Sequence, residues 1–305
     1  MLLQSKWLLI GNNNQIIKTM KTRIFLMITA LAIISFSSCK KDAVLDQASV
    51  DLADDDAVSE AIFEDVFNTV DYADIILDGF QKGESSKSDA FVVLSDSCPA
   101  VTITHPADAL WPKTITVDYG TGCTGFYENT RAGKILIVVS GPRRETGSTR
   151  TTTFDNYFIN GIKVEGTHVL ENLGFNSNQN LLVSATLTGG KITLPDGKTI
   201  QRSFEHQREW IAGLLTPNPW DDECLITGTA SGVNINGTAY TRTITTALRW
   251  ERVCRFMVSG VIDIALGDQE PFQLNFGTGD CDAVATVTRG GESREITLRF
   301  RHRLM

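Results

Sequence analysis

The sequence predicts an all-β protein, a mainly antiparallel meander or sandwich of about fifteen strands, preceded by a signal peptide and one acidic amphipathic helix. Apolar and polar residues alternate along many short runs, as in Thr114–Tyr119 and Glu295–Arg301, which is the period of a half-buried strand. Asn-Gly or Asp-Gly pairs at 160–161, 196–197 and 236–237 favour type I′ hairpin turns. The loops between runs are mostly short, which favours antiparallel neighbours.

The segment 20–38 has the three parts of a secretory signal peptide. Lys21 and Arg23 supply a positive start, an apolar run of thirteen residues follows at 24–36, and two serines precede Cys39. The run is shorter than the roughly 20 residues that span a bilayer. The segment resembles a bacterial lipoprotein signal, with phenylalanine where leucine is usual three residues before the cysteine; an ordinary secretory signal is the alternative. The resemblance implies that Cys39 is acylated and attaches the protein to a lipid bilayer.

Residues 1–19 fit neither a signal peptide nor a folded element, because three consecutive asparagines interrupt the apolar residues. We expect translation to start at Met20, which makes 1–19 a non-translated extension, since signal n-regions are short and positive. An unusually long n-region is the alternative. From Cys39 onward 267 residues remain, enough for one large β domain or two small ones.

The acidic residues are concentrated near the start of the expected mature chain. From Cys39 onward there are 24 Lys and Arg against 36 Asp and Glu, a balance of −12, because the four basic residues at 6, 18, 21 and 23 precede it. This balance argues against nucleic acid as a partner, since phosphate binding requires a positive surface. Between Asp42 and Lys82 there are twelve acids and one lysine, so the remaining 223 residues are close to neutral.

Residues 39–54 are typical of a polar tether, and 55–82 are predicted to form an acidic helix. Apolar residues there recur at steps of four and three: Val58, Ile62, Val66, Val70 and Ala73. The acids at 54–56 and 60 fall in the first turns, where the helix dipole favours negative charge. An EF-hand loop is rejected because its glycine and closing glutamate are absent. We expect a solvated acidic face, with the helix as a stalk for the β body.

From residue 83 to the end the sequence is β in character. The run 135–139 is apolar throughout, as in a strand buried on both faces. The segment 216–222, with its two prolines, is the one candidate boundary. It would divide a first β lobe, 83–215, from a second, 223–305, or separate two parts of one continuous domain.

Two stretches of the β region repeat one another. An aromatic-Gly-Thr-Gly box occurs at 119–122 and again at 276–279. Each box is followed by a cysteine and, seven residues later, by Thr-Arg-x-Gly. Each cysteine also has a partner upstream, at a spacing of 25 or 27 residues. The match of box, cysteines and downstream motif indicates an internal repeat.

The repeat selects two disulfides, Cys98–Cys123 and Cys254–Cys281, in the oxidising compartment that a secreted protein reaches. Each closes a loop of about 25 residues, worth roughly 3–4 kcal/mol in the chain-entropy model. Cys224 is left over. We expect it to be buried and inert rather than a reactive thiol, because its neighbours are acidic and reactivity needs an electropositive setting.

The motifs CRFMVSGVIDI, NFGTGDCDAVATVTRGGESREITL, FDNYFINGIKVEGT and ITGTASG carry a further resemblance. They are similar to those of an uncharacterised family of Bacteroidota outer-membrane lipoproteins. The resemblance covers most of residues 89–305. It implies an outer-membrane location, with the periplasmic or surface-exposed face left open, and it carries no known activity.

Sequence motifs for catalysis, cofactors and metals are mostly absent. There is no G-x-S-x-G, H-E-x-x-H or phosphate-binding glycine loop, and we predict no catalytic residue, cofactor or metal site. Asp280 and Asp282 could offer oxygens to calcium, but such a site needs six or more. In the strand predicted at 204–210, His206 and Arg208 share one face while the glutamates share the other. A solvated strand with a charge ladder is therefore favoured over an acid–base site.

Trp111 and Trp220 are the candidate ligand contacts, because tryptophans in loops can stack on sugar rings. The alternative is that each pins its loop to the sheet. We expect a membrane-anchored lipoprotein whose rigid β body binds a glycan or an envelope protein, or has a structural role, without catalysis. The alternative is a carboxylate-dependent hydrolase acting on glycans, which needs two carboxylates roughly 5–9.5 Å apart in a cleft.

Overall fold

The computed structural model describes residues 45–82, 91–95, 98–124, 128–216, 218–254 and 256–298. All of them belong to the compact unit Ala43–Met305. The predicted extension 1–19, the signal peptide 20–38 and Cys39 lie outside the described residues, and so do residues 40–44 of the predicted tether. The tether prediction is wrong for residues 47–54, which belong to the helix described below.

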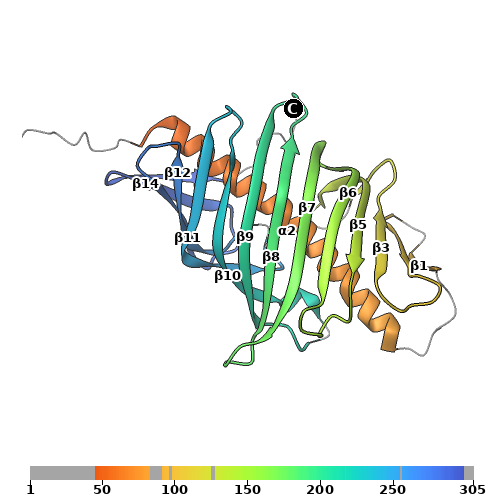
Figure 1. The fold of residues 1–305 in the computed structure, drawn as a ribbon. Coiled ribbons are helices and arrows are strands. Elements are labelled where there is room, and N and C mark those ends of the chain that lie inside the picture. The colour runs from red at the N-terminus through yellow and green to blue at the C-terminus, as the bar shows by residue number, and fades with distance from the viewer. Residues whose placement is uncertain are drawn as a thin grey trace, which may run out of the picture. The chain divides into compact units, whose positions relative to one another are not determined.

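Within the described residues, fifteen strands form one antiparallel sheet, which confirms the predicted fold class. The strands are β1 (Phe91–Ser95), β2 (Ala100–Thr104), β3 (Lys113–Asp118), β4 (Cys123–Thr124), β5 (Thr130–Val139), β6 (Thr149–Ile159), β7 (Ile162–Phe175), β8 (Leu181–Thr193), β9 (Thr199–Ala212), β10 (Glu223–Val233), β11 (Ala239–Glu251), β12 (Ser259–Leu266), β13 (Phe272–Thr278), β14 (Val284–Arg289) and β15 (Glu292–Thr297). Fourteen follow one another in sequence order, and β4 pairs only with β5 (Figure 1). Of the two predicted arrangements, the meander is the one observed.

The sheet continues across the segment that was the candidate domain boundary. β9 and β10 flank this segment and pair along their length, from Glu223 opposite Ala212 to Val233 opposite Gln201. A short 3-10 helix, η3 (Pro219–Asp221), lies in the connection. The two predicted lobes are therefore parts of one sheet.

The three Asn-Gly and Asp-Gly pairs all lie at turns, but only one turn is of the predicted type. Asn160 and Gly161 both have positive φ, 51° and 78°, and they join β6 to β7 directly, as a type I′ turn requires. At 196–197 and 236–237 only the glycine has positive φ. Each of these two loops has three residues rather than two, and its last residue is the glycine in the left-handed conformation. This is the usual form of a three-residue hairpin loop.

The one α-helix of the described residues, α2 (Gln47–Lys82), lies against the inner face of the sheet and crosses the strands obliquely (Figure 1). Its apolar residues Ile62, Val66 and Val70 are fully buried in the same core as inward residues of the strands. The helix begins at Gln47, eight residues before the predicted start. Asp46 precedes it and accepts a hydrogen bond from the Ser49 backbone amide at 2.8 Å, as an N-cap does.

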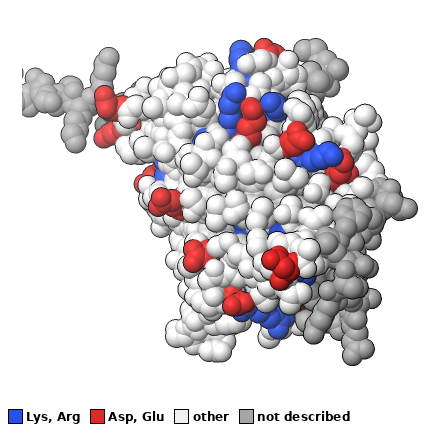
Figure 2. All heavy atoms as spheres, turned by 45° about the vertical axis from the view of Figure 1, so that its right-hand side comes forward, with Lys and Arg blue, Asp and Glu red and all other residues white. Residues whose placement is uncertain are grey.

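The outer face of the sheet carries mainly short polar side chains. One row of laterally paired residues contains a threonine on most of its strands: Thr104, Thr114, Thr151, Thr186, Thr229, Thr243 and Thr288. Threonine suits this position because it is β-branched and its hydroxyl reaches water. Lys, Arg, Asp and Glu are scattered over the surface seen in Figure 2 and form no acidic band there.

Candidate functional site

Eight acids of α2 are buried against the inner face of the sheet: Asp54, Asp55, Asp56, Glu60, Glu64, Asp65, Asp71 and Asp74. The predicted solvated acidic face was therefore wrong, and so was the stalk. The reason lies in the sheet, which turns arginines inward at the positions opposite these acids. A buried charge is tolerated when it is paired and hydrogen-bonded.

Seven arginines pair with carboxylates of α2, namely those of Asp56, Glu60, Glu64, Asp65, Asp71 and Asp74. They are Arg131 on β5, Arg143 after β5, Arg150 on β6, Arg202 and Arg208 on β9, Arg242 on β11 and Arg252 after β11. Asp74 accepts hydrogen bonds from Arg150 Nε at 2.9 Å and from Arg143 Nη1 at 3.3 Å. These seven cations are arginines rather than lysines, which suits burial because the guanidinium fork can satisfy both carboxylate oxygens.

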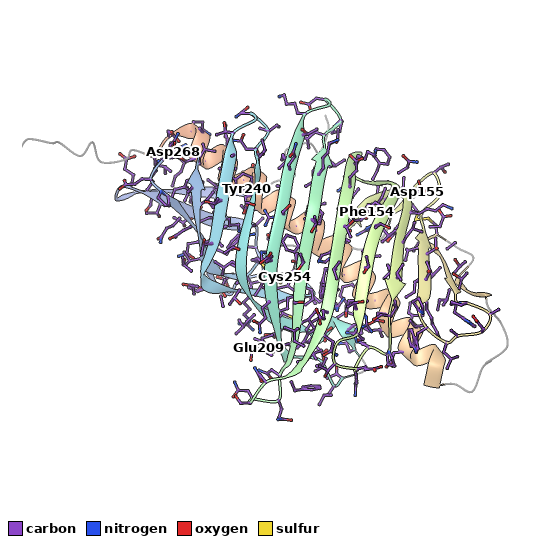
Figure 3. The ribbon with its side chains drawn as sticks, in the orientation of Figure 1. Phe154, Asp155, Glu209, Tyr240, Cys254 and Asp268 are labelled. Atoms are coloured by element: carbon purple, nitrogen blue, oxygen red, sulfur yellow. A yellow bond between two sulfur atoms is a disulfide. The ribbon has the colours of Figure 1, made fainter. Side chains whose placement is uncertain are left out.

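The faces predicted for residues 204–210 are correct, but the solvated surroundings are not. Phe204, His206, Arg208 and Trp210 share the inner face and are all buried under α2. Glu209, labelled near the lower end of β9 in Figure 3, takes the outer face, where it accepts hydrogen bonds from the side-chain amides of Asn176 and Asn180, each at 2.7 Å. The sequence already indicated that Arg208 is buried, because it is separated from Phe204 and Trp210 by even numbers of residues and so lies on the same face of the strand.

The ion pairs do not all favour ionisation equally. Burial would raise the pKa of Glu60, but the guanidinium groups of Arg242 and Arg202 hold it well below its usual value. Burial raises the pKa of Glu64, and its partner Arg208 offsets this only in part. The helix is thus held most firmly where two arginines converge on one carboxylate.

This arrangement leaves the helix carboxylates poorly suited to hydrolysis. The carboxylates of Asp56, Glu60, Glu64 and Asp65 each contact an arginine of the sheet. In the part of the chain that the structure describes, no group of three or more His, Cys, Asp or Glu side chains is placed to hold a metal ion. The paired acids therefore serve to fix α2 in the sheet.

One sizeable cavity lies beside this array, between the C-terminal half of α2 and strands β2 to β5. We call it the edge cavity; its volume is about 440 Å³, within the range of small-molecule sites. Thr69, Tyr72, Ala73 and Ile76 form its helix wall, at the spacing of one helical face. A second cavity, near Asp71, has only about 40 Å³, which is room for water.

Strands and a disulfide form the opposite wall of the edge cavity. Val101 on β2 and Val117 on β3 are directly paired and both turn inward. Cys98 and Cys123 lie at disulfide distance, with Cα atoms 6.1 Å apart, and join the start of β2 to β4 at the rim. The exposed residue Thr124 marks the opening.

Three polar side chains line the edge cavity in its buried part. Arg131, only 1% exposed, donates from Nε to Asp65 at 3.0 Å and from Nη1 to the Asn129 carbonyl at 3.2 Å, and its Nη2 also donates to Asp65. Burial raises the pKa of Tyr119, so its hydroxyl stays protonated, and it hydrogen-bonds Thr69. The described lining residues include no carboxylate.

The predicted tryptophan contacts do not come together. Trp111 lies between β2 and β3, half-buried against the core, with Lys113 Nζ 4.9 Å from its ring centre. Trp220 lies in η3 between β9 and β10, partly exposed. Six strand spacings separate the two loops, roughly 29 Å along the sheet. Trp111 thus matches the loop-pinning alternative, and a shared sugar-binding surface is not formed.

The cysteines are placed as the repeat predicted. Cys254, labelled in Figure 3, follows β11 and lies at disulfide distance from Cys281, with Cα atoms 5.4 Å apart. Cys224 is unpaired and fully buried, and burial raises the pKa of its thiol well above the usual value. A protonated, enclosed thiol is inert, as expected.

Comparisons with known proteins give no relative for this chain. No family model matches it, and no match was found among curated proteins or solved structures. Within the described residues, no helix is both long and apolar enough to span a membrane. The resemblance to Bacteroidota lipoproteins therefore stays a prediction.

Proposed function

We propose that this protein is a lipid-anchored protein of the cell envelope whose β body binds a small ligand in the edge cavity. The observation that carries the proposal is the cavity itself, about 440 Å³ and lined mainly by apolar side chains. Its walls are held by elements fixed elsewhere, because α2 is tied to the sheet by buried ion pairs and β2 to β4 by the Cys98–Cys123 pair. A preformed site loses little entropy on binding.

Two sequence features support the cell envelope as the location. The segment before Cys39 has the layout of a lipoprotein signal, and the two cysteine pairs at disulfide distance favour an oxidising compartment. The anchor would be the acylated Cys39 on the outer membrane. A glycan or an envelope protein as an additional partner stays a prediction.

Fractionation tests the anchor. The Cys39→Ala chain should move from washed membranes to the soluble fraction, while Cys224→Ala, which also removes a cysteine outside both pairs, should stay bound. A processed Cys39→Ala chain that remains on membranes after a salt wash would contradict lipid attachment.

Thermal unfolding tests the cavity. The small-molecule fraction of an envelope extract should raise the melting temperature of the wild-type chain, as a ligand that binds only the native state must. Val117→Phe fills the cavity and should abolish the rise; Val138→Phe adds the same ring on the exposed outer face of β5 and should keep it. Equal rises in both variants would refute the cavity as the site.

Turnover assays decide between binding and hydrolysis. Ester, glycoside and peptide substrates should remain intact with the purified chain. Reproducible hydrolysis that a single Asp or Glu substitution abolishes, with the fold intact, would replace binding by catalysis.

A further inference from the structure

The walls of the edge cavity are apolar on both sides. Ala73 and Ile76 face it from α2, and the small side chain of Ala73 leaves space that a longer residue would fill. Val101 and Val117 face it from the sheet. A ligand gains free energy here in proportion to the apolar surface it removes from water, so most of its own surface must be apolar.

The charge of the cavity is balanced before a ligand arrives. Arg131 is the one charged residue among the described lining residues, and both carboxylate oxygens of Asp65 contact its guanidinium. An anionic ligand would lose its hydration shell and meet a cation that is already neutralised. A cationic ligand would meet no carboxylate in the described lining. Either charge is therefore disfavoured.

A few polar atoms remain available to orient a ligand. The hydroxyls of Tyr119 and Thr69 lie on the cavity wall, deep beside Arg131, whereas Tyr72 is 40% exposed at the rim. Thr69 donates its hydroxyl proton to the Asp65 carbonyl at 3.0 Å, and Tyr119 hydrogen-bonds Thr69. The two hydroxyl oxygens therefore offer acceptor lone pairs, which suit a ligand with one or two uncharged N–H or O–H donors at one end. This combination of apolar walls and a small polar end selects for an amphipathic but neutral molecule.

We propose that the edge cavity binds a small, uncharged, mainly apolar molecule, with its polar end toward Tyr119 and Thr69. This inference rests on the proposed function and adds the chemical class of the ligand. The Cys98–Cys123 pair and the residues of α2 fix the shape of the edge cavity. The cavity therefore selects its ligand by shape and by absence of charge.

A matched pair of fluorescent probes tests the ligand class. N-phenyl-1-naphthylamine is neutral and apolar, and 8-anilino-1-naphthalenesulfonate has the same rings with one added sulfonate. The full chain with Cys39→Ala is used, because it needs no detergent into which the probes could partition. The neutral probe should bind saturably and at least about tenfold more tightly than the sulfonate, a difference of about 1.4 kcal/mol.

Cavity-filling variants locate the binding. Val117→Phe fills from the sheet and Ile76→Trp from the helix, and each should weaken the neutral probe at least about tenfold, while Val138→Phe should bind like the parent chain. Circular dichroism checks the fold of each variant. Two cavity-filling variants on opposite walls are used so that misfolding of one does not decide the result. Tighter sulfonate binding that Val117→Phe abolishes would overturn the ligand class but leave the proposed function. Neutral-probe binding unchanged in both fillers would overturn the ligand class and the cavity together.

Discussion

Replacing the buried histidine on β7 should make the protein more resistant to mild acid. His168 is only 1% exposed, neither ring nitrogen has a hydrogen-bond partner, and its ring meets Phe204 edge-on with centroids 5.6 Å apart. Burial and the nearby charge of Arg208 lower its pKa from 6.5 to about 3. The unfolded chain therefore binds a proton below about pH 6.5 that the folded chain refuses until about pH 3, so stability falls as pH decreases through this window.

The size of the effect follows from the shift. Each pH unit below 6.5 costs about 1.4 kcal/mol, so the histidine should remove about 2 kcal/mol of stability between pH 7.5 and 5.0. His168→Phe keeps a ring in the core and abolishes this loss. The dependence of the free energy of unfolding on pH that remains belongs in part to His206, because burial also lowers the pKa of that histidine. Urea unfolding at the two pH values measures the difference. His168→Gln, which packs less well but does not titrate, should lose the same slope, and an unchanged slope in both variants would refute the reasoning.

Three further perturbations test the packing of α2 and the sheet. Replacing Cys254 and Cys281 together by Ala should lower the free energy of unfolding by about 3 kcal/mol. Non-reducing peptide mapping of the wild type should recover the Cys254 and Cys281 peptides linked by a disulfide. Arg242→Met leaves Glu60 with one guanidinium fewer in a buried setting, so urea unfolding should show a loss of about 3–5 kcal/mol; no loss would mean that the pair is exposed in solution. Gly228→Ala should cost about 1–3 kcal/mol by thermal unfolding, because its Cβ would lie 2.1 Å from a backbone oxygen of β9, and a neutral result would place β9 and β10 further apart.

The strands were predictable because the signal is local. Alternation along Thr114–Tyr119 and the Asn-Gly turn at 160–161 each specify structure within a few residues. The internal repeat also placed both cysteine pairs, since the same box recurs beside each. Helix α2 was located by its period, although Asp46, which caps it, was assigned to the tether.

The surroundings of that helix were not predictable from its own residues. Acids such as Glu60 look solvated until the arginines that pair with them are known, and Arg242 is 182 positions away. For the same reason, a strand that turns arginines inward is predicted to be exposed unless the acidic helix that packs against it is known. The edge cavity is hidden for the same reason, because its walls come from α2 and from strands that meet it only in the folded chain.

Amide hydrogen exchange along residues 47–82 tests most directly whether α2 is an inner layer of the protein. An ion-paired helix buried under the sheet should exchange only through opening of the core, with protection close to that of the central strands β7 to β10. A solvated helix would fray and exchange far faster than the strands, because isolated helices are marginally stable in water. Fast exchange across 54–74 with protected strands would contradict both the buried ion pairs and the cavity that α2 helps to form.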